Sequence, residues 1–387
     1  MPSTPERMDW CGLVHLFVDR PPDGNFGRIV SQHRAFVIPT LTVLESTIGV
    51  ASAASLITDP NLAPFLPVTV ASNLNRAFPV RLDSAKNYAA AEATVRQLKA
   101  ARVPILAGSD APNPGTAHGA SLHRELELLV RAGLKPTEAL AAATSVPAAQ
   151  FNVADRGSIK PGLRADLLLV KGDPTTDIKA TRNIVRIWKE GRAVDRNAYL
   201  AEVEKSKAED ARLRHASAPP GSESGLVSDF EEDRPKARFG FGWLVSSDKF
   251  LGGKSMAAMK IVEDGANGSR SSLLIEGEVA VGIPFGWAGV MFAPGPVPMT
   301  PVNLSAKKQV LFWARGDGNT YRVMLFAKSY GFLPAGCDFI TGPEWKRYAF
   351  ELSRFDGMDG HDLMGLAFAS GPDLGRFVFQ IDDVRFP

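Results

Sequence analysis

The first 155 residues alternate between short apolar runs and helix-like patterns, and this alternation is the feature that most constrains the fold. The apolar runs lie at residues 12–18, 36–46 and 103–110. The helix-like stretches lie at residues 26–34, 84–102, 121–133 and 136–150. Strand–helix alternation predicts a parallel sheet with right-handed crossovers. Three strand–helix units are too few to close an eight-stranded (β/α) barrel, and their edge strand would be left open.

The third apolar run, VPILAGSD, places an acidic residue where a strand meets a loop. Asp110 ends this run, and a loop rich in proline and glycine follows it. In α/β barrels, catalytic residues come from the ends of strands at one face of the barrel. Asp110 is therefore a candidate catalytic carboxylate, and a capping or turn role is the alternative.

Two stretches of the chain resemble a known family. The segment from Val103 to Phe151 resembles the last strand and loop of the metal-dependent amidohydrolases, in their imidazolonepropionase-like and prolidase-like branch. Residues 156–194 resemble the return of that family into its small β-sandwich. The matching residues are Gly157, Ile159, Gly162, Ala165, Asp166, Leu167, Val185, Trp188 and Gly191. The resemblance implies hydrolysis of amide, cyclic amide or dipeptide C–N bonds with a divalent metal, which we expect to be zinc.

The same resemblance implies roles for three residues. Asp110 would bind the metal and take a proton from the attacking water, and His15 in GLVHLF would be a second metal ligand. Neutral imidazole and carboxylate are ligands that suit Zn²⁺. His118, in the loop after Asp110, would lie at the mouth of the barrel and contact the substrate. The alternatives are a buried strand histidine for His15 and a structural loop residue for His118.

The chain departs from the family pattern in its set of metal ligands. The family carries His-x-His on its first strand, and no His-x-His occurs in this sequence. Two ligands are fewer than the three that catalytic zinc sites usually have. The sequence therefore predicts that the site is incomplete in this chain, that the chain alone binds metal weakly and is inactive, and that coding sequence precedes Met1.

From Asp229 onward, short apolar–polar alternations separated by glycine and aspartate predict an all-β sandwich or jelly roll. The segments FGWLVSSDKFLGGKS (241–255) and FQIDDVRF (379–386) resemble the complex I intermediate-associated protein family, a galactose-binding-like jelly roll. A carbohydrate, a protein or no ligand at all are the alternatives for this domain.

The predicted fold class is therefore α/β plus all-β, and the amidohydrolase resemblance implies that the α/β part is a partial TIM-like barrel. The sequence places a barrel portion at residues 1–155, part of a β-sandwich at 156–200, a linker at 201–228 and the jelly roll at 229–387. The linker is charged at first and then rich in proline, glycine and serine, which is typical of a flexible segment.

The composition excludes several other classes. The net charge is +2, with 45% hydrophobic and 22% charged residues, so nothing favours nucleic acid or an anionic membrane as a partner. Cys11 and Cys337 fall in different predicted domains, which argues against a disulfide framework. Neither a signal peptide nor a membrane-spanning stretch is evident, so the chain as written is expected in the cytoplasm unless an upstream region redirects it. Two functions remain: a metal-dependent hydrolase, or a non-catalytic binding or assembly protein that acts through its jelly roll.

Overall fold

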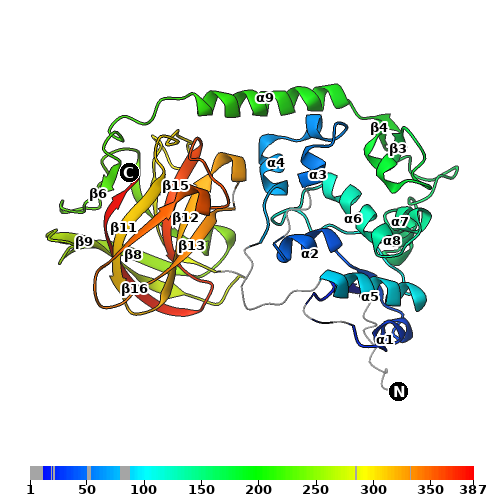
Figure 1. Cartoon of the computed structure of the whole chain (residues 1–387), viewed down its shortest axis with the longest axis horizontal. Coiled ribbons are helices and arrows are strands. Elements are labelled where there is room, and N and C mark those ends of the chain that lie inside the picture. Colours follow the sequence, from blue (N-terminus) through cyan, green and yellow to red (C-terminus); the bar gives the residue numbers. More distant parts are fainter. Residues whose placement is uncertain are drawn as a thin grey trace, which may run out of the picture. The chain divides into compact units, whose positions relative to one another are not determined.

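The computed structural model describes residues 12–18, 20, 22–49, 54–78, 88–283, 286–331 and 333–387. The chain divides into two compact units, Met1–Ser206 and Lys207–Pro387. The first contains a short parallel sheet with many helices, and the second is a β-sandwich (Figure 1). This arrangement confirms the α/β plus all-β class. The division falls inside the predicted linker, and the limits of the four predicted segments stay predictions.

The parallel sheet of the first unit consists of β1 (Gly12–Val14) and β2 (Phe36–Ile38), and the segment around Ile105 extends it. Leu13 lies opposite Val37 in the β1–β2 ladder, and Val37 also forms a parallel bridge with Ile105. Because all three segments run in the same direction, their carboxyl ends lie at the same edge of the sheet.

Helices supply most of the first unit. They are α1 (Phe26–Gln32), α2 (Leu41–Thr47), α3 (Ala54–Ile57), η1 (Ala63–Phe65), α4 (Val68–Leu74), α5 (Tyr88–Ala100), α6 (Ala120–Arg131), α7 (Pro136–Ala142) and α8 (Ser145–Gln150). On α5, the spacing of Ala91, Val95 and Leu98 puts all three on one buried face. These side chains join Val37 and Leu129 in the main core of this unit.

The second apolar run is a strand only over its first three residues, so the prediction of a strand over 36–46 is wrong. Pro39 has no N–H to donate to a ladder, and Thr40 turns the chain with a left-handed φ of 54°. Helix α2 follows. The backbone N–H groups of Leu41 and Thr42 donate to the Glu125 carboxylate on α6, at 3.0 and 2.8 Å. A buried side chain distant in the sequence thus stabilises a helix where the apolar run alone predicts a strand.

Three other predicted elements are shorter than expected. The strand predicted over 103–110 is reduced to a single parallel bridge at Ile105. The first apolar run forms a strand only up to Val14, because His15 has a left-handed φ of 67°. The predicted helix 136–150 is two helices, since Thr144 leaves helical geometry with φ −135° and ψ −86°. The Thr144 hydroxyl donates to the carbonyl oxygen of Leu140 at 2.7 Å, a local bond that competes with regular helix structure.

A small antiparallel sheet follows α8 and matches the turns and strands predicted for this stretch. It consists of β3 (Leu167–Val170), β4 (Ile184–Lys189) and β5 (Arg192–Ala193), with the turn η2 (Ile178–Arg182) between β3 and β4. The chain then enters α9 (Arg196–Arg214), which is rich in charged residues. Across the described part of the chain, no helix is both long and apolar enough to cross a membrane.

The second unit consists of two antiparallel sheets. One has the strand order β13-β12-β15-β10-β7, and the other has the order β14-β11-β16-β9-β8 with β6 beside β16. The strands are β6 (Leu226–Ser228), β7 (Gly242–Ser247), β8 (Met256–Glu263), β9 (Ser271–Val279), β10 (Ala288–Ala293), β11 (Gln309–Gly316), β12 (Thr320–Ala327), β13 (Ala335–Ile340), β14 (Lys346–Glu351), β15 (Leu363–Ser370) and β16 (Gly375–Arg385). Short turns join them at η3 (Asp248–Leu251), η4 (Lys328–Tyr330) and η5 (Leu352–Arg354). This sandwich agrees with the predicted all-β jelly-roll class.

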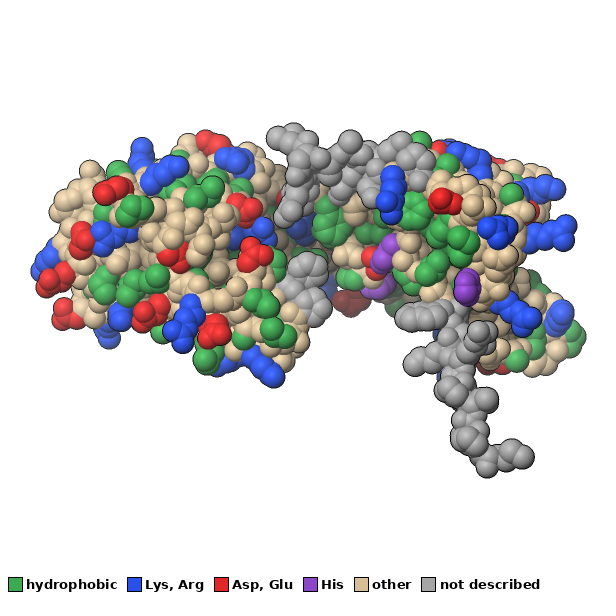
Figure 2. All heavy atoms as spheres, turned by 90° about the horizontal axis from the view of Figure 1, so that it is seen from below, with side chains coloured by type: hydrophobic (Ala, Val, Ile, Leu, Met, Phe, Trp, Pro, Cys, Tyr) green, Lys and Arg blue, Asp and Glu red, His purple; other side chains and the backbone are tan. Residues whose placement is uncertain are grey.

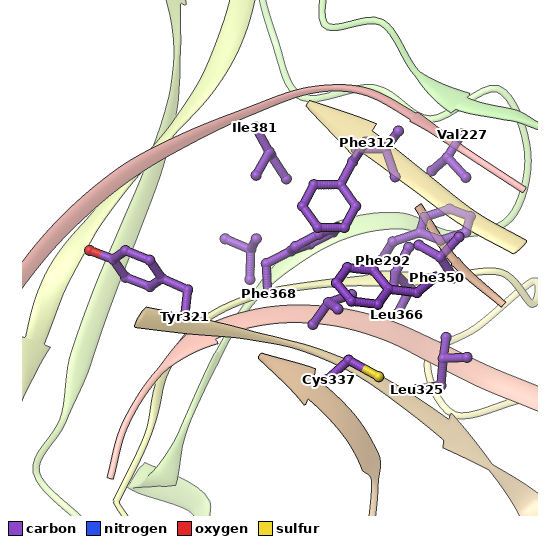
Figure 3. Close-up of a cluster of buried hydrophobic side chains, with 14 of the residues drawn as sticks. Val227, Phe292, Phe312, Tyr321, Leu325, Cys337, Phe350, Leu366, Phe368 and Ile381 are labelled. Atoms are coloured by element: carbon purple, nitrogen blue, oxygen red, sulfur yellow. The ribbon is translucent and has the colours of Figure 1, made fainter. Parts of the chain in front are cut away.

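Aromatic side chains from both sheets fill the core of the sandwich (Figure 3). The rings of Phe312 on β11 and Phe368 on β15 meet edge to face, with centroids 4.8 Å apart. Trp243 is also buried, and its indole N–H donates to Ser228 Oγ at 2.8 Å. Burial of each such side chain contributes about 1.5–3 kcal/mol, so this unit draws its stability mainly from its own core.

Candidate metal-binding and hydrolytic site

Three residues with left-handed backbones follow the three parallel segments of the first unit. His15 follows β1, Thr40 follows β2, and Asp110 follows the segment of Ile105. Their φ angles are 67°, 54° and 51°, a region that non-glycine residues seldom adopt. Backbone strain of this kind gathers at functional sites, where the surrounding structure holds it. The carboxyl ends of parallel strands are also where α/β sheets bind ligands, so this edge is the candidate site.

The structure brings two of the predicted site residues together. The Nε2 atom of His15 lies 3.9 Å from the Oδ2 atom of Asp110, and the two side chains are 48% and 40% exposed. In a tetrahedral site with bonds of about 2.0–2.2 Å, two ligand atoms of one zinc ion lie about 3.3–3.6 Å apart, so the observed separation is a few tenths of an ångström wider. An imidazole nitrogen and a carboxylate oxygen at this separation, both open to solvent, fit the donor set of a divalent metal.

Asparagine side chains hold the loop that carries Asp110. Asn113 donates through Nδ2 to Asp110 Oδ2 at 2.8 Å. The Asn73 side-chain amide on α4 has two protons to donate, and its Nδ2 lies 2.7–3.1 Å from three carbonyl oxygens of the same loop, those of Pro112, Asn113 and Thr116. The sequence analysis missed both asparagines. The turn-forming composition of DAPNPG could have indicated Asn113, whereas no local signal indicates Asn73.

A buried carboxylate supports the same edge from below the surface. Glu125 on α6 is fully buried and accepts hydrogen bonds from the N–H groups of Leu41 and Thr42 and from the Thr42 hydroxyl. Burial raises the pKa of Glu125 to about 7, although these three hydrogen bonds favour the charged form. Glu125 therefore fixes the start of α2 and, with it, the backbone of the neighbouring Thr40. The sequence analysis missed this residue as well.

The remaining histidines of the first unit play other parts. His118 is exposed in the loop before α6, and the contacts among the described residues do not join its ring to His15 or Asp110. His123 packs inside the unit, where its Nδ1 contacts Thr181 Oγ1 at 3.0 Å and burial lowers its pKa to about 4. His33 is exposed at the end of α1. Figure 2 shows histidine side chains of this unit at the surface beside hydrophobic ones.

The second unit contains a different cluster of potential metal ligands. Ligand atoms of Asp210, His361 and Asp362 all lie within 4.8 Å of one another. However, His361 Nε2 contacts Asp210 at 2.7 Å, and its Nδ1 contacts Asp359 at 2.5 Å. Each ring nitrogen therefore has a carboxylate to which it can donate, which describes a protonated imidazolium with no lone pair left for a metal. We interpret this cluster as an ion-pair network that holds the end of α9.

One face of the six-stranded sheet carries two shallow hollows. The larger has a volume of about 340 Å³, and its lining residues are Glu276, Gly277, Asp317, Arg376, Phe377 and Val378. Arg315 lines the smaller hollow, of about 130 Å³. The Arg315 guanidinium lies 4.9 Å from the centre of the Trp345 ring and donates to Gln380 Oε1 at 2.7 Å. A charged, partly aromatic surface of this kind can contact a polar ligand.

One family model and several solved structures are similar to parts of this chain. The sequence model of the amidohydrolase family matches residues 28–194. A solved amidohydrolase structure is 23% identical, covers 48% of this chain and 39% of its own length, and has a TM-score of 0.34. A Xaa-Pro dipeptidase with bound methionine is 23% identical, with coverages of 48% and 40% and a TM-score of 0.36. A family 11 carbohydrate-binding module of a cellulosomal cellulase from Clostridium thermocellum is 16% identical, with coverages of 41% and 91% and a TM-score of 0.31. No curated protein matches the chain.

The first unit therefore carries an amidohydrolase-family domain at residues 28–194, in agreement with the resemblance seen in the sequence. The matched range includes Asp110 and His118 and begins after His15. The chain spans about 40% of the length of the two amidohydrolase structures. Activity and substrate do not follow from a match of that extent.

Proposed function

We propose that the first unit contributes to a metal-dependent hydrolytic site that cleaves amide, cyclic amide or dipeptide C–N bonds. The observation that supports this is the 3.9 Å approach of His15 Nε2 to Asp110 Oδ2 at the carboxyl edge of the parallel sheet. The amidohydrolase-family match over residues 28–194 supports the same assignment.

Each residue then has a defined task. A divalent ion held by His15 and Asp110 would acidify a water molecule and polarise the scissile carbonyl group. Asp110 Oδ2 faces His15 and accepts a hydrogen bond from Asn113, which leaves Oδ1 to take the proton of that water. The same carboxyl group can later return this proton to the leaving nitrogen. His118, exposed in the following loop, would contact the substrate.

The number of ligands sets the expected behaviour of this chain alone. His15 and Asp110 give two protein ligands among the described residues, and catalytic zinc sites usually have three. We therefore expect weak metal binding and no turnover unless a further ligand is supplied. Metal analysis after mild dialysis should show well under one equivalent of zinc. A stoichiometric ion that is lost in Asp110→Ala would contradict this expectation.

The activity test compares the chain with a version extended by the first five strand–helix units of a related amidohydrolase. Both are assayed on a panel of dipeptides and N-acyl amino acids with added Zn²⁺ or Mn²⁺. The extended form should turn over at least one substrate, Asp110→Asn should abolish this activity, and Asp155→Asn is the matched control at a surface ion pair. Turnover by the unextended chain that survives Asp110→Asn would refute the proposed role of Asp110.

A second candidate function is carbohydrate binding by the second unit. The hollow of about 340 Å³ on the six-stranded sheet and the stacking of Arg315 on Trp345 favour it. Calorimetry with a mixed-linked β-glucan tetrasaccharide tests this candidate. Arg376→Ala, in the hollow, should weaken binding about tenfold, whereas Arg322→Ala on the other sheet should not. No heat of binding with the parent chain would remove this candidate.

A further inference from the structure

The hydroxyl of Thr40 decides which nitrogen of the His15 ring carries a proton. Thr40 Oγ1 lies 2.8 Å from the carbonyl oxygen of Pro39 and 2.8 Å from His15 Nδ1. A carbonyl oxygen can only accept a hydrogen bond, and a hydroxyl has a single proton to donate. If that proton pointed to His15, two oxygen lone pairs would face each other at 2.8 Å on the Pro39 side. The Thr40 proton therefore points to Pro39, and His15 Nδ1 must be the donor to Thr40.

This assignment also determines the protonation of Nε2, the other ring nitrogen of His15. In a neutral imidazole with its proton on Nδ1, Nε2 carries the lone pair. That lone pair faces Asp110 Oδ2 at 3.9 Å, so two acceptors approach each other with no proton between them. Such a pair is satisfied by a cation placed between the two atoms. The Nδ1–H tautomer is thus the form in which His15 can bind a metal through Nε2.

The surrounding structure holds Thr40 firmly in place. Its side chain is 2% exposed, so water cannot easily replace the contact with His15. Its backbone is left-handed, and the next two N–H groups, those of Leu41 and Thr42, are bound by the buried Glu125 carboxylate. The hydroxyl therefore has little freedom to turn away from either partner.

We propose that Thr40 is a positioning residue that locks His15 in the Nδ1–H tautomer and presents Nε2, together with Asp110, to a divalent cation. The inference rests on the proposed function for the cation, whereas the tautomer can be tested without it. Removing a hydrogen bond of this kind from a metal-binding histidine typically weakens metal affinity about 10–100-fold.

The experiment uses the full chain with ¹⁵N-labelled histidine, in the parent and in Thr40→Val and Thr40→Ser. Protonated and unprotonated ring nitrogens have well-separated ¹⁵N shifts, and loss of a signal in His15→Gln identifies His15. At a pH where the ring is neutral, the parent and Thr40→Ser should show a proton on Nδ1. Thr40→Val should shift the population toward Nε2–H. Calorimetric titration with Zn²⁺ should then show about 10–100-fold weaker binding for Thr40→Val and little change for Thr40→Ser.

The outcomes separate this inference from the proposed function. A parent with its proton on Nε2 overturns the role of Thr40, and this result needs no variant to fold. An unchanged tautomer in a folded Thr40→Val chain overturns it as well. If the tautomer responds as expected but Zn²⁺ affinity is the same in the parent and in Thr40→Val, the tautomer assignment stands and the proposed role of this edge as a cation site fails.

Discussion

Replacement of Asp210 by asparagine should destabilise the second unit, because it removes a partner of a buried charge. His361 is 3% exposed and lies between Asp210 and Asp359, at 2.7 and 2.5 Å. Burial by itself lowers the pKa of His361, but the hydrogen bonds with Asp359 and Asp210 outweigh burial and hold the pKa above its ordinary value. The raised pKa favours the charged form of the ring, and its two carboxylate partners stabilise that charge.

The structure sets the size of the effect. Removing one partner of a buried ion pair costs about 3–5 kcal/mol. Asp210 is 15% exposed and Asp359 remains in place, so we expect a smaller loss of about 2–3 kcal/mol. For a unit of this size, each kcal/mol shifts the melting temperature by about 2–4 °C. The second unit of Asp210→Asn should therefore melt about 5–10 °C lower than that of the parent.

Tryptophan fluorescence during heating follows this unit, since Trp243, Trp287, Trp313 and Trp345 belong to it. The matched control is Glu202→Gln, which changes a carboxylate to an amide at an exposed position on the same helix.

The effect of Asp210→Asn on stability should depend on pH, and the direction follows from the pKa of His361. His361 has a raised pKa in the folded state, so its contribution is fully present below the unfolded value of 6.5. It is lost as the pH rises through the folded pKa, so the difference between parent and Asp210→Asn should shrink toward alkaline pH. A melting temperature equal to that of the control, or a difference that does not change with pH, would refute the ion-pair interpretation.

Three further predictions concern the rest of the chain. Glu125 has its pKa raised from 4.5 to about 7, so the stability of the first unit should fall by about 3 kcal/mol as pH rises from about 4.5 to about 7. Urea unfolding of Glu125→Gln should show a flatter pH profile in this window, and an unchanged slope would contradict the assignment. A fragment of residues 207–387 should melt at a higher temperature than one of residues 226–387, because only the longer fragment keeps Asp210, the partner of His361 on α9. Equal melting temperatures in calorimetry would contradict this role of Asp210. Asp110→Ala should abolish whatever weak Zn²⁺ binding calorimetry detects in the parent, and retained binding would place the ion elsewhere.

Much of the fold follows from periodicity in the sequence. The apolar runs near residues 12 and 36, the alanine-rich helix that became α5, and the short alternating strands after Asp229 were all predicted from spacing alone. The sequence predicted a strand where the structure has the helix Leu41–Thr47, and this error has a clear physical cause. The N–H groups that begin this helix are bound by Glu125, which is more than 80 residues away in the sequence. Local patterns do not report contacts at that separation.

The sequence analysis likewise found some residues of the candidate site and missed others. His15 and Asp110 were indicated by their places at the ends of apolar runs and by the family resemblance, and the structure places them 3.9 Å apart. Their assignment as metal ligands stays a prediction. Thr40 and Asn73 hold these residues or their loop through contacts across 25 to 43 positions, and neither residue stands out in the sequence. Residues that support a site through contacts with distant parts of the chain therefore cannot be identified from the sequence pattern alone.

The carboxyl edge of the parallel sheet carries a cost in folding free energy, and this cost favours a binding role over a purely structural one. Left-handed backbones at His15, Thr40 and Asp110 each cost about 1–3 kcal/mol, and a fully buried carboxylate at Glu125 adds a desolvation penalty. A unit that served only as a scaffold would be more stable with ordinary strand ends at these three positions. Three of the left-handed residues of the first unit, His15, Thr40 and Asp110, lie at this one edge, where an imidazole nitrogen faces a carboxylate oxygen. A cation site requires such a pair of donors, and this supports the proposed hydrolase interpretation of the first unit.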